Sequence, residues 1–393
     1  MAQLWSRRSA STKPGDRSPT EPRPSASIIL LSPTNQVLLL HRVQTSSAFP
    51  SAHVFPGGNL SAFHDGAVPE PGSPDRHQDG PAYRLGAVRE TFEESGILLA
   101  RSKDDAAAGE SPGLLDVPDD VREEGRKEVH ANRVPFAEWL SGVGGVPDVA
   151  RTENLIPFTR WITPANTAKR FTTQMYLYML PLPPSSSSSP SPAAAGGAPG
   201  APQQEAVIPV PTHDGGLEHT AATFDDASTW LAKQRSGEIV LFPPQLFLLT
   251  LVSRFLTGPP GPNSAAPDRE HYAAQRAALL RFVSGAAEAP APSSAGAHRT
   301  AAIPWADKVM SPHVLFLRAG DGRVVLGLDR PGPELQGSGR GGDWERVVLV
   351  RFEKGGPREV EVRGRAEVLA EERREKEKEE KEAKRGEENG AKL

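Results

Sequence analysis

One stretch, residues 84–97 (RLGAVRETFEESGI), constrains this chain more than any other. An α-helix turns about 100° per residue, so this stretch divides into two sides. One side carries apolar or small side chains that are expected to face a core, namely Leu85, Val88, Phe92 and Ser95. Gly96 follows, and glycine is the residue that most readily adopts the left-handed conformation at a helix end. The stretch therefore predicts a helix that ends at Gly96.

The opposite side of this helix carries three carboxylates, Glu90, Glu93 and Glu94, within one turn of each other. Like charges at this spacing destabilise a helix. One interpretation is a solvated acidic face, with Arg89 paired to Glu93 four residues on. The other is a site for a hard divalent cation, because Mg²⁺ and Mn²⁺ prefer oxygen ligands and leave positions for water and phosphate. The helix alone does not decide between them.

The wider pattern favours the cation. Residues 89–97 (RETFEESGI) resemble the core of the Nudix box, Arg-Glu-U-x-Glu-Glu-x-Gly-U, where U is apolar. Upstream, the residues Phe55-Pro56-Gly57-Gly58 resemble the strand and loop that precede that box. The resemblance implies an α+β protein with the Nudix fold, a mixed β-sheet sandwiched between helices. We expect this fold to carry low-complexity insertions and a small β-rich C-terminal appendage.

The box departs from the family pattern in three ways. A segment rich in Pro, Gly and Asp, about residues 59–82, separates Gly58 from the helix. Pro81 stands eight residues before Arg89, where the family has a glutamate, and Thr91 replaces a bulkier apolar residue. An insertion is tolerable because loop closure costs little more as a loop lengthens. The role of the missing glutamate is either unfilled or filled by Asp79 or another acid in the insertion.

Composition limits the other possibilities. The formal net charge of −4 over 393 residues gives no general reason to expect nucleic-acid binding. The absence of cysteine excludes disulfides, thiolate metal sites and cysteine catalysis. No apolar run reaches the roughly 18 to 20 residues of a membrane span. The 39 prolines and 37 glycines cluster, so the folded part is smaller than the length indicates.

These clusters predict five regions. They are a disordered N-terminus (1–24), a Nudix domain (25–257, with insertions at about 59–82 and 181–211), a linker with a helix (258–300), a β-rich appendage (301–365) and a charged tail (366–393). Alternation and turn residues predict strands at 27–32, 37–42, 52–55, 97–100, 155–164, 169–180, 218–224, 313–317, 324–328, 344–352 and 359–362. Further helices are expected in 120–141 (with a break at Pro135), 226–236, 246–256 and 269–284.

The tail has two features. Residues 367–385 are almost all Glu, Lys and Arg, which is typical of a solvated helix or a disordered segment. The sequence ends in Ala391-Lys392-Leu393, a close variant of the Ser-Lys-Leu peroxisomal address. We therefore expect a peroxisomal import receptor as a partner and the peroxisome as the location, with the cytoplasm or mitochondrion as alternatives.

By resemblance, Nudix enzymes hydrolyse a nucleoside diphosphate linked to another group. Matched residue by residue, Glu90, Glu93 and Glu94 correspond to the family's metal ligands, and Gly57 or Gly58 to the glycine whose carbonyl joins them. Arg89 corresponds to the arginine that orients one acid. The resemblance implies Mg²⁺ or Mn²⁺ as cofactor, and Glu218 is a candidate general base.

One branch of the family is similar over about residues 25–256, the peroxisomal coenzyme A diphosphatases. Segments characteristic of that branch resemble residues 38–42 and 49–58, and further along the chain residues 161–164, 169–173 and 243–245. That branch cleaves coenzyme A or acyl-CoA into 3′,5′-ADP and phosphopantetheine or its acyl form. Arg42, Lys169 and Arg170 are then candidates for contacting the 3′-phosphate. The alternatives are a Nudix hydrolase on another pyrophosphate, such as ADP-ribose, NADH or a diphosphoinositol phosphate, and a non-catalytic binding module.

Overall fold

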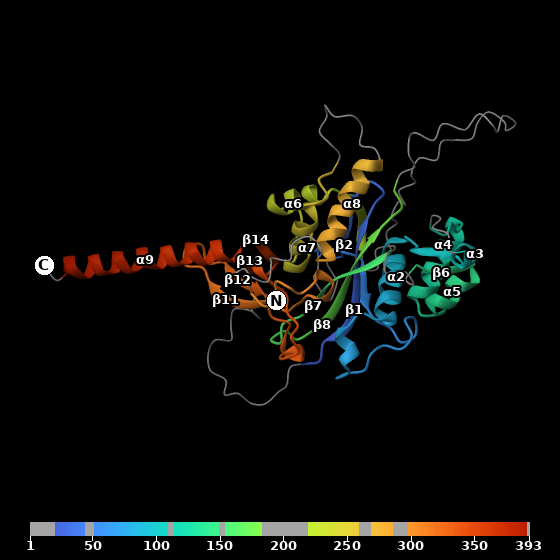
Figure 1. Ribbon diagram of the computed structural model, residues 1–393, viewed down its shortest axis with the longest axis horizontal. Coiled ribbons are helices and arrows are strands. Elements are labelled where there is room, and N and C mark those ends of the chain that lie inside the picture. Colours follow the sequence, from blue (N-terminus) through green and yellow to red (C-terminus); the bar gives the residue numbers. More distant parts are fainter. Residues whose placement is uncertain are drawn as a thin grey trace, which may run out of the picture.

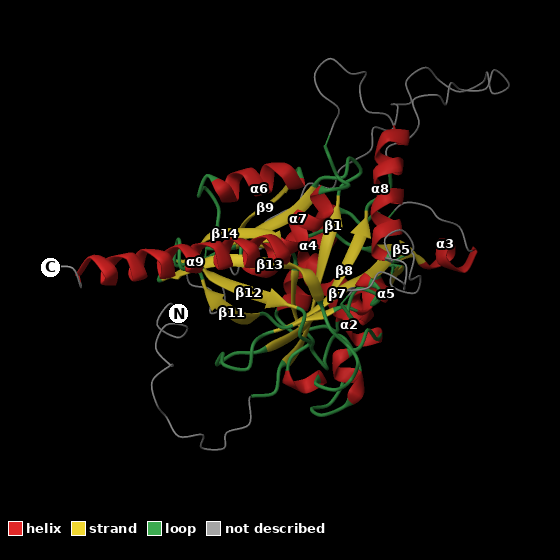
Figure 2. Ribbon diagram, turned by 60° about the vertical axis from the view of Figure 1, so that its left-hand side comes forward, coloured by secondary structure: helices red, strands yellow, loops and turns green. Residues whose placement is uncertain are grey.

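A mixed β-sheet forms the centre of the protein, for which a computed structural model describes residues 20–43, 51–108, 114–148, 154–182, 219–258, 269–285 and 298–390. Across the sheet, the strands run in the order β10 (Val309–Met310), β7 (Leu155–Ile162), β8 (Phe171–Met179), β1 (Arg23–Leu31), β2 (Val37–Arg42) and β3 (His53–Val54). In addition, β4 (Gly57–Asn59) pairs with β1, and β9 (His219–Asp225) pairs with β2. β1 and β8 are parallel, whereas β1 and β2 form the expected antiparallel pair. Figure 2 shows β7, β8 and β1 side by side.

Side chains alternate along the strands of the sheet, so that neighbouring residues enter different cores on its two faces. On β8, Tyr176 and Tyr178 enter one core, and Met175 and Leu177 enter the other, as the alternation predicted. One face is covered by α2 (Pro81–Ser95), α4 (Asp119–His130) and α5 (Phe136–Gly142). The other is covered by α6 (Ala227–Arg235), α7 (Pro243–Ser253) and α8 (Arg269–Val283) (Figure 1). The predicted α+β sandwich is confirmed.

Smaller elements complete this part of the molecule. They are the pair β5 (Ala100–Ser102) and β6 (Gly145–Pro147), the helix α3 (Lys103–Ala108), and the short 3₁₀ helices η1 (Pro74–His77), η3 (Trp305–Asp307) and η4 (Pro333–Leu335). Within the described ranges, no helix is both long enough and apolar enough to cross a bilayer.

A second sheet follows near the C-terminus. Its antiparallel strands are β11 (His313–Leu317), β12 (Val324–Leu328), β13 (Asp343–Glu353) and β14 (Gly356–Gly364), and the long helix α9 (Arg365–Gly390) comes after them. The sheet packs on α7 and shares a hydrophobic core with α6, α7 and α8. α9 leaves this sheet and projects away from the body of the protein (Figure 1).

The boundaries differ from the expected ones in several places. α8 lies in the predicted linker, yet Leu279 and Phe282 are buried in the core beside Trp305. β10 lies in the predicted appendage, yet it extends the main sheet through β7. The sequence shows that these segments are amphipathic or apolar, but it does not show which core receives them.

Three local expectations also need correction. The first strand begins at Arg23, inside the predicted disordered terminus, because it pairs with β8 from Phe171 onward. Helix α2 begins at Pro81, inside the predicted insertion, since proline suits the first helical turn. The strand expected at 97–100 is instead β5 at Ala100–Ser102, and residues 97–99 form a buried connection. Most of the predicted insertion at 181–211, Glu218 and residues 391–393 lie outside the described residues.

Candidate functional site

Helix α2 carries the site, and its two ends follow from its sequence. Pro81 occupies the first turn after the extended residue Gly80. Gly96 ends the helix in a left-handed conformation at φ 72°, and its N–H donates to the carbonyl of Phe92 at 2.8 Å. The predicted glycine stop is confirmed. Phe92 packs in the core with Phe136 and Trp139 from α5.

The acidic side of α2 is not solvated. Glu93 and Glu94 are only 8% and 6% exposed, and Glu90 is partly buried. Thr91 is fully buried as well, so almost the whole circumference of the helix is covered. Burial of charged groups is costly unless they are paired or coordinated. The interpretation of a solvated acidic face is therefore excluded by the structure.

A glycine corner covers these acids. The N–H of Gly57 donates to Oε2 of Glu94 at 2.7 Å. A Cβ atom added at Gly58 would lie 2.5 Å from the carboxylate of Glu90. A Cβ atom at Gly57 would lie 2.3 Å from the carbonyl oxygen of Ala26 on β1. At Gly57 only glycine fits against the backbone of β1, whereas a side chain at Gly58 would displace the carboxylate of Glu90.

Arg89 is the centre of a buried ionic network. Its Nε and Nη2 atoms donate to the two carboxylate oxygens of Asp65, each at 2.9 Å. Its Nη1 atom lies 2.7 Å from Glu93 Oε1 and 2.9 Å from Glu90 Oε1. Nη2 also donates to the carbonyl of Asn59 at 3.0 Å. The arginine thus ties the inserted segment to the acids of the helix, through the two-pronged geometry that guanidinium favours.

The sequence alone did not single out Asp65. It is an acid of the inserted segment, where Asp79 or another acid was expected as one way to fill the role of the missing glutamate, and it lies beside Arg89. Asp79 lies elsewhere, where it pairs with Arg84 and accepts a hydrogen bond from Tyr176. The only signal in the sequence is that Asp65 lies shortly after Gly58, close to the spacing of the family's glutamate.

Helix α4 supports Glu93 from the other side. Arg126 Nε donates to the carbonyl of Glu93 at 2.6 Å, and His130 Nδ1 lies 3.2 Å from Glu93 Oε2. Burial alone would raise the pKa of Glu93, but the hydrogen bonds from His130 and Arg89 outweigh it and lower the pKa. Neither Arg126 nor His130 was predicted, because nothing in the sequence places α4 against α2.

Glu90 has the opposite character. Burial raises the pKa of Glu90, Arg89 opposes this rise, and the neighbouring charges of Glu93 and Asp65 add to it, so that the pKa is about 7. Two acids three residues apart on one helix therefore differ in their tendency to ionise. This difference is typical of functional carboxylate clusters, because each environment favours a different protonation state.

The inserted segment closes the site. His64 accepts a hydrogen bond from the backbone N–H of Phe136 at Nδ1, at 3.2 Å, and its Nε2 lies 3.0 Å from Asn132 Oδ1. Burial lowers the pKa of His64, which favours this neutral form. His64 and its neighbour Asp65 thus fasten the segment to α4, α5 and α2 together.

A cavity of about 230 Å³ lies between these groups. It is lined by the three box glutamates, Arg89, His64, His130, Asn132 and residues 59–61. The donor set suits a hard divalent cation, since it offers carboxylate oxygens beside the backbone of Gly58. Arg89 contacts Glu90 and Glu93 as well as Asp65, and among the described residues no three acidic or histidine side chains are arranged as a metal site. A cation in this cavity would compete with Arg89 for Glu90 and Glu93.

The structure does not bring the predicted phosphate contacts into this cavity. Arg42 is half-buried on β2, and Lys169 is exposed before β8. Arg170 is 2% exposed, donates to the carbonyl of Thr163 and pairs with Glu334, so it joins the β7–β8 turn to the C-terminal part. The candidate base Glu218 lies outside the described residues.

Part of the chain is similar to known proteins. Residues 72–192 match the family described as the NUDT19 Nudix domain. The chain is 33% identical over 159 residues to the putative nudix hydrolase 7 of Caenorhabditis elegans. This matched region covers 40% of this chain and 44% of that protein. It is 31% identical over 212 residues to the acyl-coenzyme A diphosphatase NUDT19 of Gallus gallus, with 44% and 53% covered. The chain spans about half the length of these relatives.

A solved structure is also similar, that of a NUDIX hydrolase from Alicyclobacillus acidocaldarius. It is 20% identical with a TM-score of 0.41, and it covers 59% of this chain and 90% of that one. Residues 72–192, together with the box on α2 and the glycine corner beside it, resemble the Nudix hydrolase family. Within that family it resembles the NUDT19 branch, whose curated members from Gallus gallus and Homo sapiens are named acyl-coenzyme A diphosphatases.

Proposed function

We propose that this protein hydrolyses the pyrophosphate bond of coenzyme A or acyl-CoA with the help of a divalent metal ion. The products would be 3′,5′-ADP and phosphopantetheine or its acyl form. One observation carries this proposal: Glu90 and Glu94 lie against the Gly57–Gly58 corner, and together with Glu93 they line a cavity of about 230 Å³. Arg89 is shared by Asp65, Glu90 and Glu93, so these carboxylates carry more negative charge than one arginine balances, and a divalent cation would balance the rest.

Glu90, Glu93 and Glu94, with the backbone of Gly58, would hold Mg²⁺ or Mn²⁺. Such an ion, when bound, neutralises the diphosphate and lowers the pKa of water. The protein's own groups keep these acids in place. The N–H of Gly57 fixes one oxygen of Glu94, and Arg89 with His130 fixes both oxygens of Glu93. Arg89 also supplies positive charge while no cation is bound, which limits repulsion between the carboxylates.

The choice of substrate rests on the relatives. Those of the NUDT19 branch are named acyl-coenzyme A diphosphatases, and the similarity covers residues in the box and in the strands beside it. A Nudix hydrolase acting on ADP-ribose or NADH is the second candidate, since the box chemistry is the same for every diphosphate. The third candidate is a non-catalytic binding module. It is favoured by the ion pairs of Arg89 with Glu90 and Glu93, which take up carboxylate oxygens that a metal ion would need.

A substrate panel tests the proposal. The purified protein is incubated with coenzyme A, an acyl-CoA, ADP-ribose and NADH, with Mg²⁺, with Mn²⁺ or with a chelator, and the products are identified by mass. We expect 3′,5′-ADP from the coenzyme A compounds only when metal is present. Preference for another diphosphate would contradict the substrate, and binding without turnover under every metal would contradict catalysis. Glu138→Gln, an exposed acid on α5, serves as the matched control.

We also propose peroxisomal import through Ala391-Lys392-Leu393, on the sequence motif alone. A fluorescent protein fused before residue 1 would colocalise with peroxisomes. Deletion of Leu393 would then disperse it. Equal distributions of the two fusions would contradict this proposal without affecting the proposed activity.

A further inference from the structure

A second pocket, of about 350 Å³, opens beside the carboxylate cavity. Three segments form it: the start of β1, the end of β4, and the inserted segment that follows β4. Two of its residues, Asn59 and Leu60, also line the carboxylate cavity. The two spaces therefore share one wall. A ligand whose diphosphate occupies the first has its next groups within reach of the second.

The shared wall is fixed to both sides. Asn59 pairs with Ser25 on β1, and the N–H of Leu60 donates to the carbonyl of Pro24 at 3.0 Å. The carbonyl of Asn59 accepts from Arg89 at 3.0 Å, so the wall is also bonded to the box arginine. The side chain of Asn59 is left to line the pocket.

Arg76 holds the far side of this second pocket together. It is 7% exposed and donates to the carbonyls of Pro22, at 3.3 Å, and Pro69, at 2.5 Å. Its Nε also lies 3.2 Å from Glu21. The charge of Arg76 is thus already balanced, and its hydrogen bonds keep the inserted segment beside β1. Arg76 is a positioning residue here.

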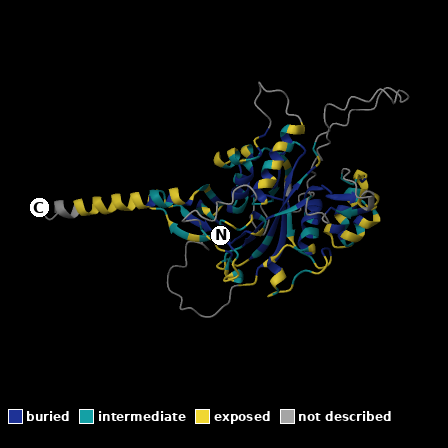
Figure 3. Cartoon of the chain, viewed as in Figure 1, coloured by how far each residue is buried: buried dark blue, intermediate teal, exposed yellow. Residues whose placement is uncertain are grey.

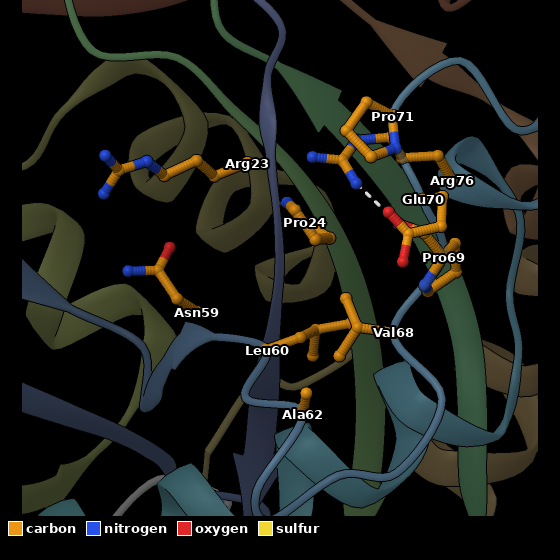
Figure 4. A pocket seen from close by; sticks show the side chains of 10 residues that line it. All are labelled: Arg23, Pro24, Asn59, Leu60, Ala62, Val68, Pro69, Glu70, Pro71 and Arg76. Atoms are coloured by element: carbon orange, nitrogen blue, oxygen red, sulfur yellow. Dashed lines mark hydrogen bonds between the residues drawn. The ribbon is translucent and has the colours of Figure 1, made fainter.

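Arg23 differs from Arg76 in this respect. It is exposed, and within the described ranges its guanidinium has no hydrogen-bond or ion-pair partner. Figure 4 shows its side chain on the same side of the pocket as Asn59, whereas Glu70 and Arg76 lie on the opposite side. Between them lie apolar side chains, namely Pro24, Leu60, Ala62 and Val68. The pocket thus offers a free cation and an amide beside an apolar surface.

We propose that this second pocket receives the phosphate-bearing nucleoside end of the diphosphate substrate, with Arg23 binding its phosphate monoester. This inference rests on the proposed function. Guanidinium binds phosphate through paired hydrogen bonds, and the apolar lining suits the face of a base. Arg42, Lys169 and Arg170, which the resemblance makes candidates for this contact, line neither of the two described pockets.

Kinetics with a matched pair of substrates test the role of Arg23. The KM values of coenzyme A and of 3′-dephospho-coenzyme A are measured for the wild type, Arg23→Gln and Arg23→Lys. We expect Arg23→Gln to raise the KM of coenzyme A by about tenfold to hundredfold more than that of the dephospho compound, the range of one hydrogen bond to a charged group. Arg23→Lys, which keeps the charge, should restore part of the difference.

The control is Arg235→Gln, which removes an exposed arginine from α6 on the other face of the sheet. It should leave the ratio of the two KM values unchanged. Equal effects of Arg23→Gln on both substrates, or none on either, would overturn the subsite while the proposed function stands.

Calorimetry separates the two proposals when no turnover occurs. The binding of 3′,5′-ADP is compared with that of 5′-AMP, for the wild type and for Arg23→Gln. If the wild type cleaves neither substrate but binds 3′,5′-ADP in a manner that depends on Arg23, the proposed function fails and the subsite stands. If the binding of 3′,5′-ADP does not depend on Arg23, the subsite is overturned.

Discussion

Helices α2 and α9 both carry closely spaced glutamates, and the structure treats them in opposite ways. On α2, Glu93 and Glu94 are less than a tenth exposed and contact the glycine corner, Arg89 or α4. On α9, the charged side chains that the structure describes from Arg373 to Arg385 are all exposed (Figure 3). The two helices therefore carry similar acidic residues but differ in how far those residues are buried.

This contrast shows what separates a site from a solvated helix. The acids of α9 from Glu375 to Glu382 are exposed, so water can satisfy them. The acids of α2 have lost most of their water, so each needs a fixed donor or a cation. A substitution on α2 should therefore change activity or stability, whereas the same substitution on α9 should change neither.

The largest difference should appear in catalysis. We expect Glu93→Gln to lower kcat/KM for the diphosphate substrate on the order of 10²- to 10³-fold, the size typical of removing one preorganised electrostatic group. Glu377→Gln on α9 should stay within about twofold of the wild type. Steady-state kinetics on both variants, with circular dichroism to establish folding, measure this. A Glu93→Gln variant with near wild-type activity would break the comparison.

A large effect on stability should follow from Asp65→Ala. Its carboxylate is fully buried and accepts two hydrogen bonds from Arg89, which keeps Glu90 and Glu93 as partners, so the loss of these charged hydrogen bonds should cost about 1.5–3 kcal/mol. Urea unfolding of the variant and the wild type measures the difference in the free energy of unfolding. Glu377→Gln is again the control and should show no measurable change. A loss below about 1 kcal/mol for Asp65→Ala would mean that the network around Arg89 is not stabilising.

A smaller effect concerns pH in the metal-free protein. Burial raises the pKa of Glu90 from 4.5 to about 7. Because the folded-state pKa is raised, the associated stability is present below pH 4.5 and is lost as the pH rises toward 7. Melting temperatures measured with a chelator between pH 4.5 and 8 should therefore fall less steeply for Glu90→Gln than for the wild type. Parallel curves for the two proteins would contradict the raised pKa.

Much of the fold could be predicted because its signals are local. Alternation marked both faces of β8, and Gly96 marked the end of α2. The packing of α8 could not be predicted, because an amphipathic pattern shows that a helix packs but not against which core. The same holds for β10, which has two residues and joins the main sheet from a distant part of the sequence.

The same distinction between local and long-range signals applies to the candidate site. The box acids and Arg89 follow from a contiguous motif, so the sequence identified them. Helical periodicity nevertheless placed the acids on the polar side, since it does not register the close approach of Gly57 and Gly58. Asp65 meets Arg89 across 24 residues of sequence, and the path of the inserted segment decides that contact. The role of Asp65 therefore required the structure.

Direct binding of Mn²⁺ tests the central claim, that the buried acids of α2 form a cation site. Calorimetric titration should give one ion per chain for the wild type, with affinity weakened at least about tenfold in Glu93→Gln and in Glu94→Gln, the equivalent of about 1.4 kcal/mol. Glu377→Gln should bind as the wild type does. Equal Mn²⁺ affinity in all four proteins would contradict the claim, because the acids of α2 would then differ from those of α9 in burial alone.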